Sequence, residues 1–136
     1  RAAAVGAFAA MAEAVGDAIA NAVTLVDGLV VIGGGLSGAS ALFLPKIIEE
    51  MNSTFEKPEG STLRRLVANV YDLEESAQLE RFLKGSTREI SIPGSSRTLR
   101  YDPEMRIGVG ISRIGTSKAI SIGAYAFALR SIDAKL

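Results

Sequence analysis

The segment Leu29–Gly38 has the sequence LVVIGGGLSG, in which four branched apolar residues lead directly into three glycines. A continuous apolar run of this kind is typical of a strand that is covered on both faces of a parallel sheet. Glycines at the end of such a strand let the backbone turn sharply and approach a ligand closely, because no Cβ stands in the way. The residues from Ala39 to Met51 have the apolar spacing of a helix. We therefore predict a strand, a glycine turn and a helix in succession, the arrangement that binds nucleotides at the carboxyl edge of open α/β sheets.

The composition limits the chemistry that the chain can carry out. Of its 136 residues, 48% are hydrophobic and 22% are charged, which is typical of a globular domain. The 15 Lys and Arg residues balance the 15 Asp and Glu residues, so we expect neither a nucleic acid nor a membrane as a partner. The absence of cysteine and histidine excludes disulfides, thiol nucleophiles, histidine acid–base catalysis and the usual zinc ligands within the chain. We accordingly predict no catalytic residue and no metal ligand here.

The amino-terminal segment is rich in alanine and other apolar residues. The sequence begins at Arg1 without a methionine, and we expect further residues upstream in a longer, cytoplasmic protein. Glu13, Asp17 and Asn21 interrupt the apolar run too early for a membrane-spanning helix. Apolar residues recur at steps of three and four, which predicts one long buried helix over residues 2–26.

Glycines inside the predicted elements indicate close approach of another backbone in the first helix, and either a weaker strand or close approach of some other group in a later strand. Gly6 and Gly16 lie within the first helix, where glycine is unfavourable. Gly108 and Gly110 lie within a second predicted buried strand, Arg106–Ile111.

Shorter patterns predict the remaining elements. Pro45 is tolerated only in the first turn of a helix, so the second helix begins near Leu44. Residues 52–61 are polar and contain proline and glycine, as expected of a connection. The other predicted helices are Thr62–Val70, Glu74–Lys84 with Gly85 as its terminator, and a mostly buried final helix from Lys118 to about Ile132.

Two alternating segments, Arg88–Ile92 and Arg97–Tyr101, predict a β-hairpin. We expect its polar side to carry Arg88, Arg97 and Arg100. A solvated face is the favoured interpretation of these arginines, and a basic rim over a phosphate-binding cleft is the alternative.

The glycine turn also fits the pattern G-x-G-x-x-G over Gly33–Gly38, the fingerprint of FAD- and NAD-binding domains. That fingerprint requires a second strand that ends in an acidic residue about twenty residues later. Glu56 is available there, but the sequence predicts no buried strand before it. An oxidoreductase that uses FAD or NAD is therefore the less favoured alternative. A glycine turn that only packs a strand against a helix is a further one.

Two stretches resemble the sugar kinases of the ROK and glucokinase type. Residues Asn21–Ser37, NAVTLVDGLVVIGGGLS, resemble the segment in which a helix end, a strand and a VIGGGLS turn follow one another. Residues Arg106–Leu129, RIGVGISRIGTSKAISIGAYAFAL, resemble the closing strand, turn and small-residue helix of the same family. The two stretches occur in the family's order, and residues 53–104 between them resemble an insertion.

The resemblance implies an α/β fold of the actin-like ATPase (ribonuclease H-like) kind. The chain would supply half of a domain: a partial sheet of parallel strands flanked by long helices, plus an inserted helical and hairpin segment. Residues 1–136 would form the later part of the nucleotide-side, C-terminal domain of a longer kinase. In the family the glycine turn touches the adenosine of ATP, and this role falls on Gly33, Gly34 and Gly35, with Leu36 beside them. The phosphate-binding segment, the catalytic aspartate and most sugar contacts would lie upstream.

As a function, the resemblance implies ATP-dependent phosphorylation of a hexose, with Mg²⁺ accompanying ATP. The implied partners are the hexose and the amino-terminal remainder of the same protein, and a homodimer is left open. A sugar-responsive transcriptional repressor of the same superfamily is the alternative. No carboxylate in the chain stands out as a catalytic base. Asp102 precedes a proline, which favours a turn-forming role for it.

Overall fold

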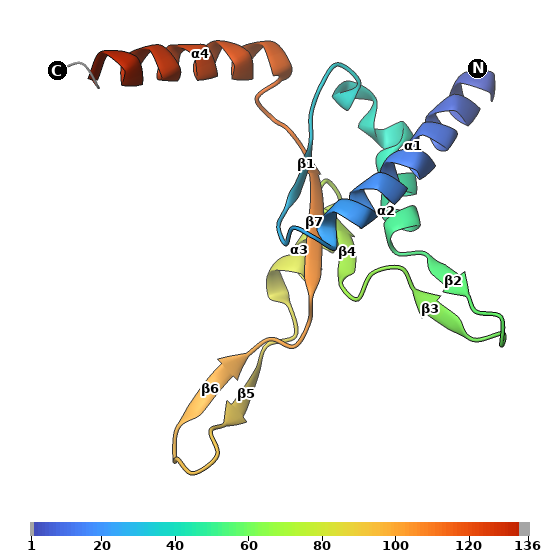
Figure 1. The fold of residues 1–136 in the computed structure, drawn as a ribbon, viewed down its shortest axis with the longest axis vertical. Helices are drawn as coiled ribbons and strands as arrows, with labels where there is room; N and C mark the ends of the chain where they lie inside the picture. Colours follow the sequence, from blue (N-terminus) through green and yellow to red (C-terminus); the bar gives the residue numbers. More distant parts are fainter. Residues whose placement is uncertain (1, 134–136) are drawn as a thin grey trace.

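A three-stranded parallel sheet lies at the centre of the computed structural model, which describes residues 2–133 (Figure 1). Strand β7 (Arg106–Ile111) is central, between β1 (Val30–Ile32) and β4 (Asn69–Asp72). The register aligns Val30 with Val109 on one side of β7 and Asn69 with Arg106 on the other. The predicted α/β class with parallel strands is therefore confirmed.

The two predicted strands differ in burial. Residues 107–110 of β7 are buried, as predicted. In β1, Val31 is 66% exposed, so the prediction of a strand covered on both faces is wrong for this strand. Among the described residues β1 pairs only with β7, which makes it an edge strand. An apolar run indicates which side chains favour burial, but it does not show what covers them.

Glycine in β7 accommodates a close neighbour, as predicted. A Cβ at Gly108 would lie 2.7 Å from Cδ1 of Leu73 and 3.0 Å from Cδ2 of Leu29. A Cβ at Gly110 would meet Cβ of Leu73 at 3.5 Å. The side chain of Leu73, which follows β4, thus occupies the space that side chains of β7 would otherwise fill.

Helix α1 (Ala2–Val23) packs against α2 (Leu44–Met51) through small residues. A Cβ at Gly16 would lie 2.8 Å from Cβ of Glu50, so the predicted close approach is confirmed at this glycine. At Gly6 a Cβ would meet nothing within 4 Å, so the same prediction is wrong there. Pro45 lies in the first turn of α2, which begins at Leu44 as predicted, after the short 3₁₀ helix η1 (Ser37–Leu42).

An arginine joins these two helices. The guanidinium of Arg65, whose side chain is 9% exposed, pairs with Glu50 of α2 at 3.0 Å and with Asp17 of α1. It also lies over the ring of Phe55, 5.3 Å from the ring centroid. Arg65 therefore fixes α1, α2 and the residues beside them in one arrangement.

The two long helices are less buried than the sequence predicts. Only Ala12, Gly16 and Ala20 of α1 are buried. Helix α4 (Thr116–Asp133) projects from the carboxyl end of β7, and residues 117–133 are all exposed (Figure 1). Helix α1 is also long and apolar enough to cross a membrane, by length and composition alone. The packing of Gly16 on α2 and the pairing of Asp17 with Arg65 are the contacts of a helix that covers a protein core.

The predicted helix Thr62–Val70 is wrong. Its residues form β3 (Thr62–Arg64), which pairs with β2 (Thr54–Glu56) in an antiparallel hairpin, and the first part of β4. The side chain of Asn52 pairs with both backbone groups of Val70, at 2.9 and 3.0 Å, and so occupies the outer edge of β4. A short run of apolar residues at steps of three and four does not distinguish a helix from a strand whose hydrogen-bond partners lie in distant segments of the chain.

The segment 53–104 also contributes to the central sheet, because it contains β4. The predicted helix Glu74–Lys84 is confirmed as α3 (Ser76–Lys84), which begins two residues later than predicted. Gly85 ends the helix with φ of +61°, the left-handed region that favours glycine. The predicted hairpin is confirmed as β5 (Arg88–Ser91) and β6 (Thr98–Tyr101), which project from the body of the molecule (Figure 1).

The faces of that hairpin differ from the prediction. Arg88 lies opposite Tyr101, and Ile90 lies opposite Leu99. Because side chains alternate along a strand, Arg88 and Arg97 share the face of Ile90 and Leu99 rather than a separate polar side. Arg100 lies on the other face, opposite Glu89.

Candidate functional site

The carboxyl ends of the three parallel strands lie at one edge of the sheet. Strand β1 continues there into the glycine turn, β7 into residues 112–115, and β4 into Leu73 and Glu74. This edge is where nucleotides bind in open α/β sheets. The predicted site residues are therefore at the position that the sequence argument requires.

The glycine turn lies directly against the end of β7. The backbone N–H of Ser112 donates to the carbonyl oxygen of Ile32 at 2.8 Å, one residue before the turn. A Cβ at Gly33 would lie 3.5 Å from Cβ of Ser112. The backbone of Gly33 is therefore packed against the neighbouring strand end and cannot shift independently of it.

The outer part of the turn is open. Gly34 has φ of +116°, a conformation that L-residues rarely adopt, and a Cβ at Gly34 or Gly35 would meet nothing within 4 Å. Ser37 closes the turn, because its backbone N–H and its hydroxyl donate to the carbonyl oxygen of Gly34 at 3.2 and 2.7 Å. Leu36 is 56% exposed beside it. The backbone at Gly34 and Gly35 is therefore open to the close approach of another molecule.

A carboxylate that the sequence argument missed reaches the same edge. Glu74 follows β4, and one of its carboxylate oxygens accepts the backbone N–H of Ile111 at 3.0 Å. Its other oxygen accepts Nη2 of Arg113 at 2.8 Å. Because we predicted a helix and not a strand before Glu74, the sequence did not indicate that Glu74 lies at the carboxyl edge of the sheet. A correct prediction of β4 would have indicated it.

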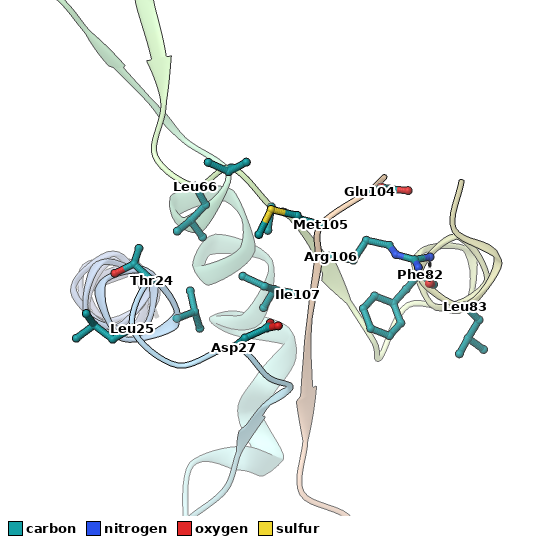
Figure 2. Close-up of a pocket in the computed structure, with 13 residues that line it drawn as sticks. Thr24, Leu25, Asp27, Leu66, Phe82, Leu83, Glu104, Met105, Arg106 and Ile107 are labelled. Carbon is teal, nitrogen blue, oxygen red and sulfur yellow. Dashed lines mark hydrogen bonds between the residues drawn. The ribbon is translucent and has the colours of Figure 1, made fainter. Parts of the chain in front are cut away.

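The opposite, amino edge of the sheet carries a cavity of about 880 Å³ (Figure 2). Figure 2 shows Phe82 and Leu83 of α3, together with Met105 and Arg106 at the start of β7, around it. None of the four predicted site residues lines this cavity. The cavity and the glycine turn are therefore separate features of the molecule.

A hydrogen-bonded network lies beside that cavity. The Glu104 carboxylate accepts the hydroxyl of Tyr71, the side-chain amide of Asn69 at 2.9 Å and the hydroxyl of Ser86 at 3.0 Å. These bonds, that of Tyr71 first, hold the pKa of Glu104 below its usual value. The bond to Glu104 raises the pKa of Tyr71, and burial raises it further.

Asp102 takes the turn-forming role that the sequence favours. Its carboxylate accepts the backbone N–H of Glu104 at 3.0 Å and pairs with Arg106 at 2.6 Å. It lies at the amino edge of the sheet, away from the glycine turn. Among residues 2–133 no group of three or more His, Cys, Asp or Glu side chains is placed so that it could hold a metal ion.

The fingerprint of FAD- and NAD-binding domains also requires a second strand that ends in an acidic residue, and the described residues contain no such strand beside β1. Glu56 lies in the antiparallel hairpin β2–β3 and is exposed. The strand beside β1 is β7, which is followed by Ser112 instead of an acidic residue. Within the described residues, no acidic side chain is thus placed to bind a ribose in the manner of those domains.

Comparison with known proteins gives one relation. No protein-family model matches the chain, and no curated protein matches it. Among solved structures, the chain is similar to a glucokinase from Parabacteroides distasonis ATCC 8503, with 45% sequence identity and a TM-score of 0.80. The match covers 96% of this chain and 34% of that glucokinase.

The chain therefore spans about a third of the length of the protein that it resembles. Because 96% of the chain is matched, most of residues 53–104 have counterparts in that glucokinase. The resemblance read from the glycine turn and from the last strand is thus confirmed over nearly the whole chain. In sequence and in fold, these residues are similar to about a third of that glucokinase.

Proposed function

We propose that this chain is part of an ATP-dependent hexose kinase of the glucokinase type and that it forms the adenosine-binding side of the active-site cleft. The observation that carries the proposal is the 45% identity to a glucokinase across 96% of the chain. The open glycine turn at the carboxyl edge of the parallel sheet supports it, because this is the place where a nucleotide would bind. The oxidoreductase alternative has no such support.

The proposal includes an arrangement of the whole protein. Residues 1–136 would belong to the nucleotide-side domain of an actin-like ATPase fold, and the catalytic aspartate and most hexose contacts would lie in the remainder of a longer chain. The match to 34% of a glucokinase leaves ample length for that remainder. Whether two such proteins form a homodimer is a separate question for the intact protein.

The mechanism assigns a positioning role to these residues. ATP with its Mg²⁺ would supply the phosphoryl group and neutralise part of its charge. Gly33, Gly34 and Gly35 would place their backbone against the adenosine, and the exposed side chain of Leu36 would contact its apolar face. Correct placement of the reacting groups accounts for a large part of the barrier reduction in such reactions.

The test is a kinase assay on the full-length protein. We expect ATP-dependent phosphorylation of glucose or another hexose, measured as ADP formation in a coupled assay. Without the coupling enzymes, the protein is expected to reduce no nicotinamide cofactor. A full-length protein that binds ATP and a hexose but shows no turnover with any common hexose would contradict the proposal. Hexose-dependent DNA binding by that inactive protein would favour the repressor alternative.

A further inference from the structure

The backbone hydrogen bonds between β4 and β7 stop short of the carboxyl edge of the sheet. The last of them runs from the N–H of Leu73 to the carbonyl oxygen of Val109, at 2.9 Å. The next N–H of β7 that faces β4 belongs to Ile111, and the carboxylate of Glu74 accepts it at 3.0 Å. The side chain of Glu74 therefore takes the place of the next backbone hydrogen bond between the two strands.

The same carboxylate holds a second group. Its other oxygen accepts Nη2 of Arg113 at 2.8 Å, and the side chain of Glu74 is 28% exposed while that of Arg113 is 80% exposed. Both contacts involve an ionised acceptor, and such hydrogen bonds are about twice as strong as neutral ones. Glu74 thus binds residues 111–113 at two points, the backbone N–H of Ile111 and the side chain of Arg113.

Those residues are the ones against which the glycine turn packs. Ile111 is bonded to Glu74 on one side, and the next residue, Ser112, is bonded to the carbonyl of Ile32 on the other. Ser112 is also the residue that a Cβ at Gly33 would touch, at 3.5 Å. The path from Glu74 to the glycine turn therefore consists of two consecutive residues, Ile111 at the end of β7 and Ser112 directly after it.

We propose that Glu74 is a positioning residue for the nucleotide site, which it serves by holding the end of β7 in register with the glycine turn. The inference rests on the proposed kinase function. Without the carboxylate, the N–H of Ile111 loses its partner and Arg113 is released, so residues 111–115 can move relative to Gly33. A shift of about 1 Å at a positioning element can lower the rate by two orders of magnitude.

The experiment compares Glu74→Ala with Glu74→Gln in the full-length protein. We expect Glu74→Ala to raise the KM for ATP about tenfold, because the end of β7 would no longer hold the glycine turn in the position that binds adenosine. The KM for the hexose is expected to stay within about twofold of the original value. Glu74→Gln keeps an oxygen for the N–H of Ile111 and is expected to restore most of the affinity for ATP.

A matched control removes another ion-paired glutamate. Glu49 pairs with Lys46 at 3.0 Å on the exposed face of α2, so Glu49→Ala should leave both KM values unchanged. Melting temperatures of all variants are measured in parallel, because a purely structural role would lower the melting temperature without separating the two KM values.

The proposal is overturned if Glu74→Ala leaves the KM for ATP within about twofold of the original, if both KM values rise together, or if Glu74→Gln is no better than Glu74→Ala. Hexose phosphorylation by the unaltered protein distinguishes this failure from a failure of the proposed function. Absence of that activity would overturn both.

Discussion

At the scale of single residues, the glycine turn shows which of its glycines the backbone requires. Gly34 alone among the predicted site residues has a positive φ, +116°, while Gly33 is restricted by its contact with Ser112. A side chain at Gly34 would meet no neighbour, so the obstacle to substitution is the backbone conformation. A change at this residue therefore alters the shape of the turn while the core is left intact.

We expect Gly34→Val in the full-length protein to raise the KM for ATP by tenfold or more and the KM for the hexose much less. Valine at this φ costs about 1–3 kcal/mol, which the turn can relieve only by changing its conformation. Steady-state kinetics with each substrate varied in turn provides the measurement. Gly38→Ala is the control, because a Cβ there also meets nothing within 4 Å and φ is not positive. An equal rise of both KM values would indicate misfolding instead.

At the scale of elements, helix α1 contains two glycines, and only Gly16 lies at the contact with α2. Gly16 faces Glu50 and the carbonyl oxygen of Ile47, at 2.8 and 3.2 Å from an added Cβ, whereas Gly6 on the same helix faces open space. The two glycines carry the same cost in helix propensity. Comparing them therefore separates helix–helix packing from intrinsic helix stability.

We expect Gly16→Ala to destabilise the full-length protein by about 1–3 kcal/mol, because the added methyl group forces the two helices apart. Gly6→Ala should instead stabilise it by up to about 1 kcal/mol through helix propensity. Urea unfolding followed by circular dichroism provides both values. Equal effects of the two substitutions would show that α1 and α2 do not pack as described.

The network around Glu104 joins β4 to the chain before β7 and predicts how stability depends on pH. The folded state lowers the pKa of Glu104 from 4.5, so its contribution to stability is present above that value and is lost as the pH falls through the lowered pKa. The pKa of Tyr71 is raised from 10.0, so its contribution is present below that value and is lost as the pH rises through the raised pKa.

We therefore expect Glu104→Gln to reduce the fall in melting temperature as the pH drops below 4.5, because the substituted side chain no longer takes up a proton on unfolding. Tyr71→Phe removes the main cause of the lowered pKa and should flatten the same part of the profile. Scanning calorimetry at several pH values measures this. Glu49→Gln is the comparison, and a profile for Glu104→Gln as steep as that of Glu49→Gln would contradict the assignment.

At the scale of the whole molecule, the described chain exposes apolar surface that a complete kinase would cover. Residues 117–133 of α4 are exposed throughout, and β1 presents Val31 at 66% exposure beside a free strand edge. Exposed apolar residues are candidates for burial against another part of a protein. The proposed remainder of the protein would supply the other half of the cleft.

We expect the 136-residue chain on its own to show no hexose phosphorylation, because the catalytic aspartate and most hexose contacts of the proposed kinase would lie in the remainder of the protein. A coupled assay at high protein concentration, beside the full-length protein, checks this. Measurable turnover by the 136 residues alone would contradict the proposed division of the active site.

The sequence by itself determined the elements whose signals are local. The run from Leu29 to Gly38, the alternating hairpin strands and the glycine after α3 each carry their own pattern, so a strand, a turn and a helix end could be predicted from adjacent residues. The same local signal placed Gly33–Gly35 at a strand end, and the family resemblance rested on it.

Only the tertiary structure decided which partners those elements have. Asn69 and Val70, the first two residues of β4, lie at the end of a segment with helical spacing, and they form a strand because β7 and Asn52 supply hydrogen bonds to them. The role of Glu74 depends on Ile111, which is 37 residues away in the chain. Burial of α1, α4 and β1 depends in the same way on what packs against them. The physical reason is that spacing along the chain specifies which side chains can share a face, while hydrogen-bond partners and covering surfaces come from distant segments.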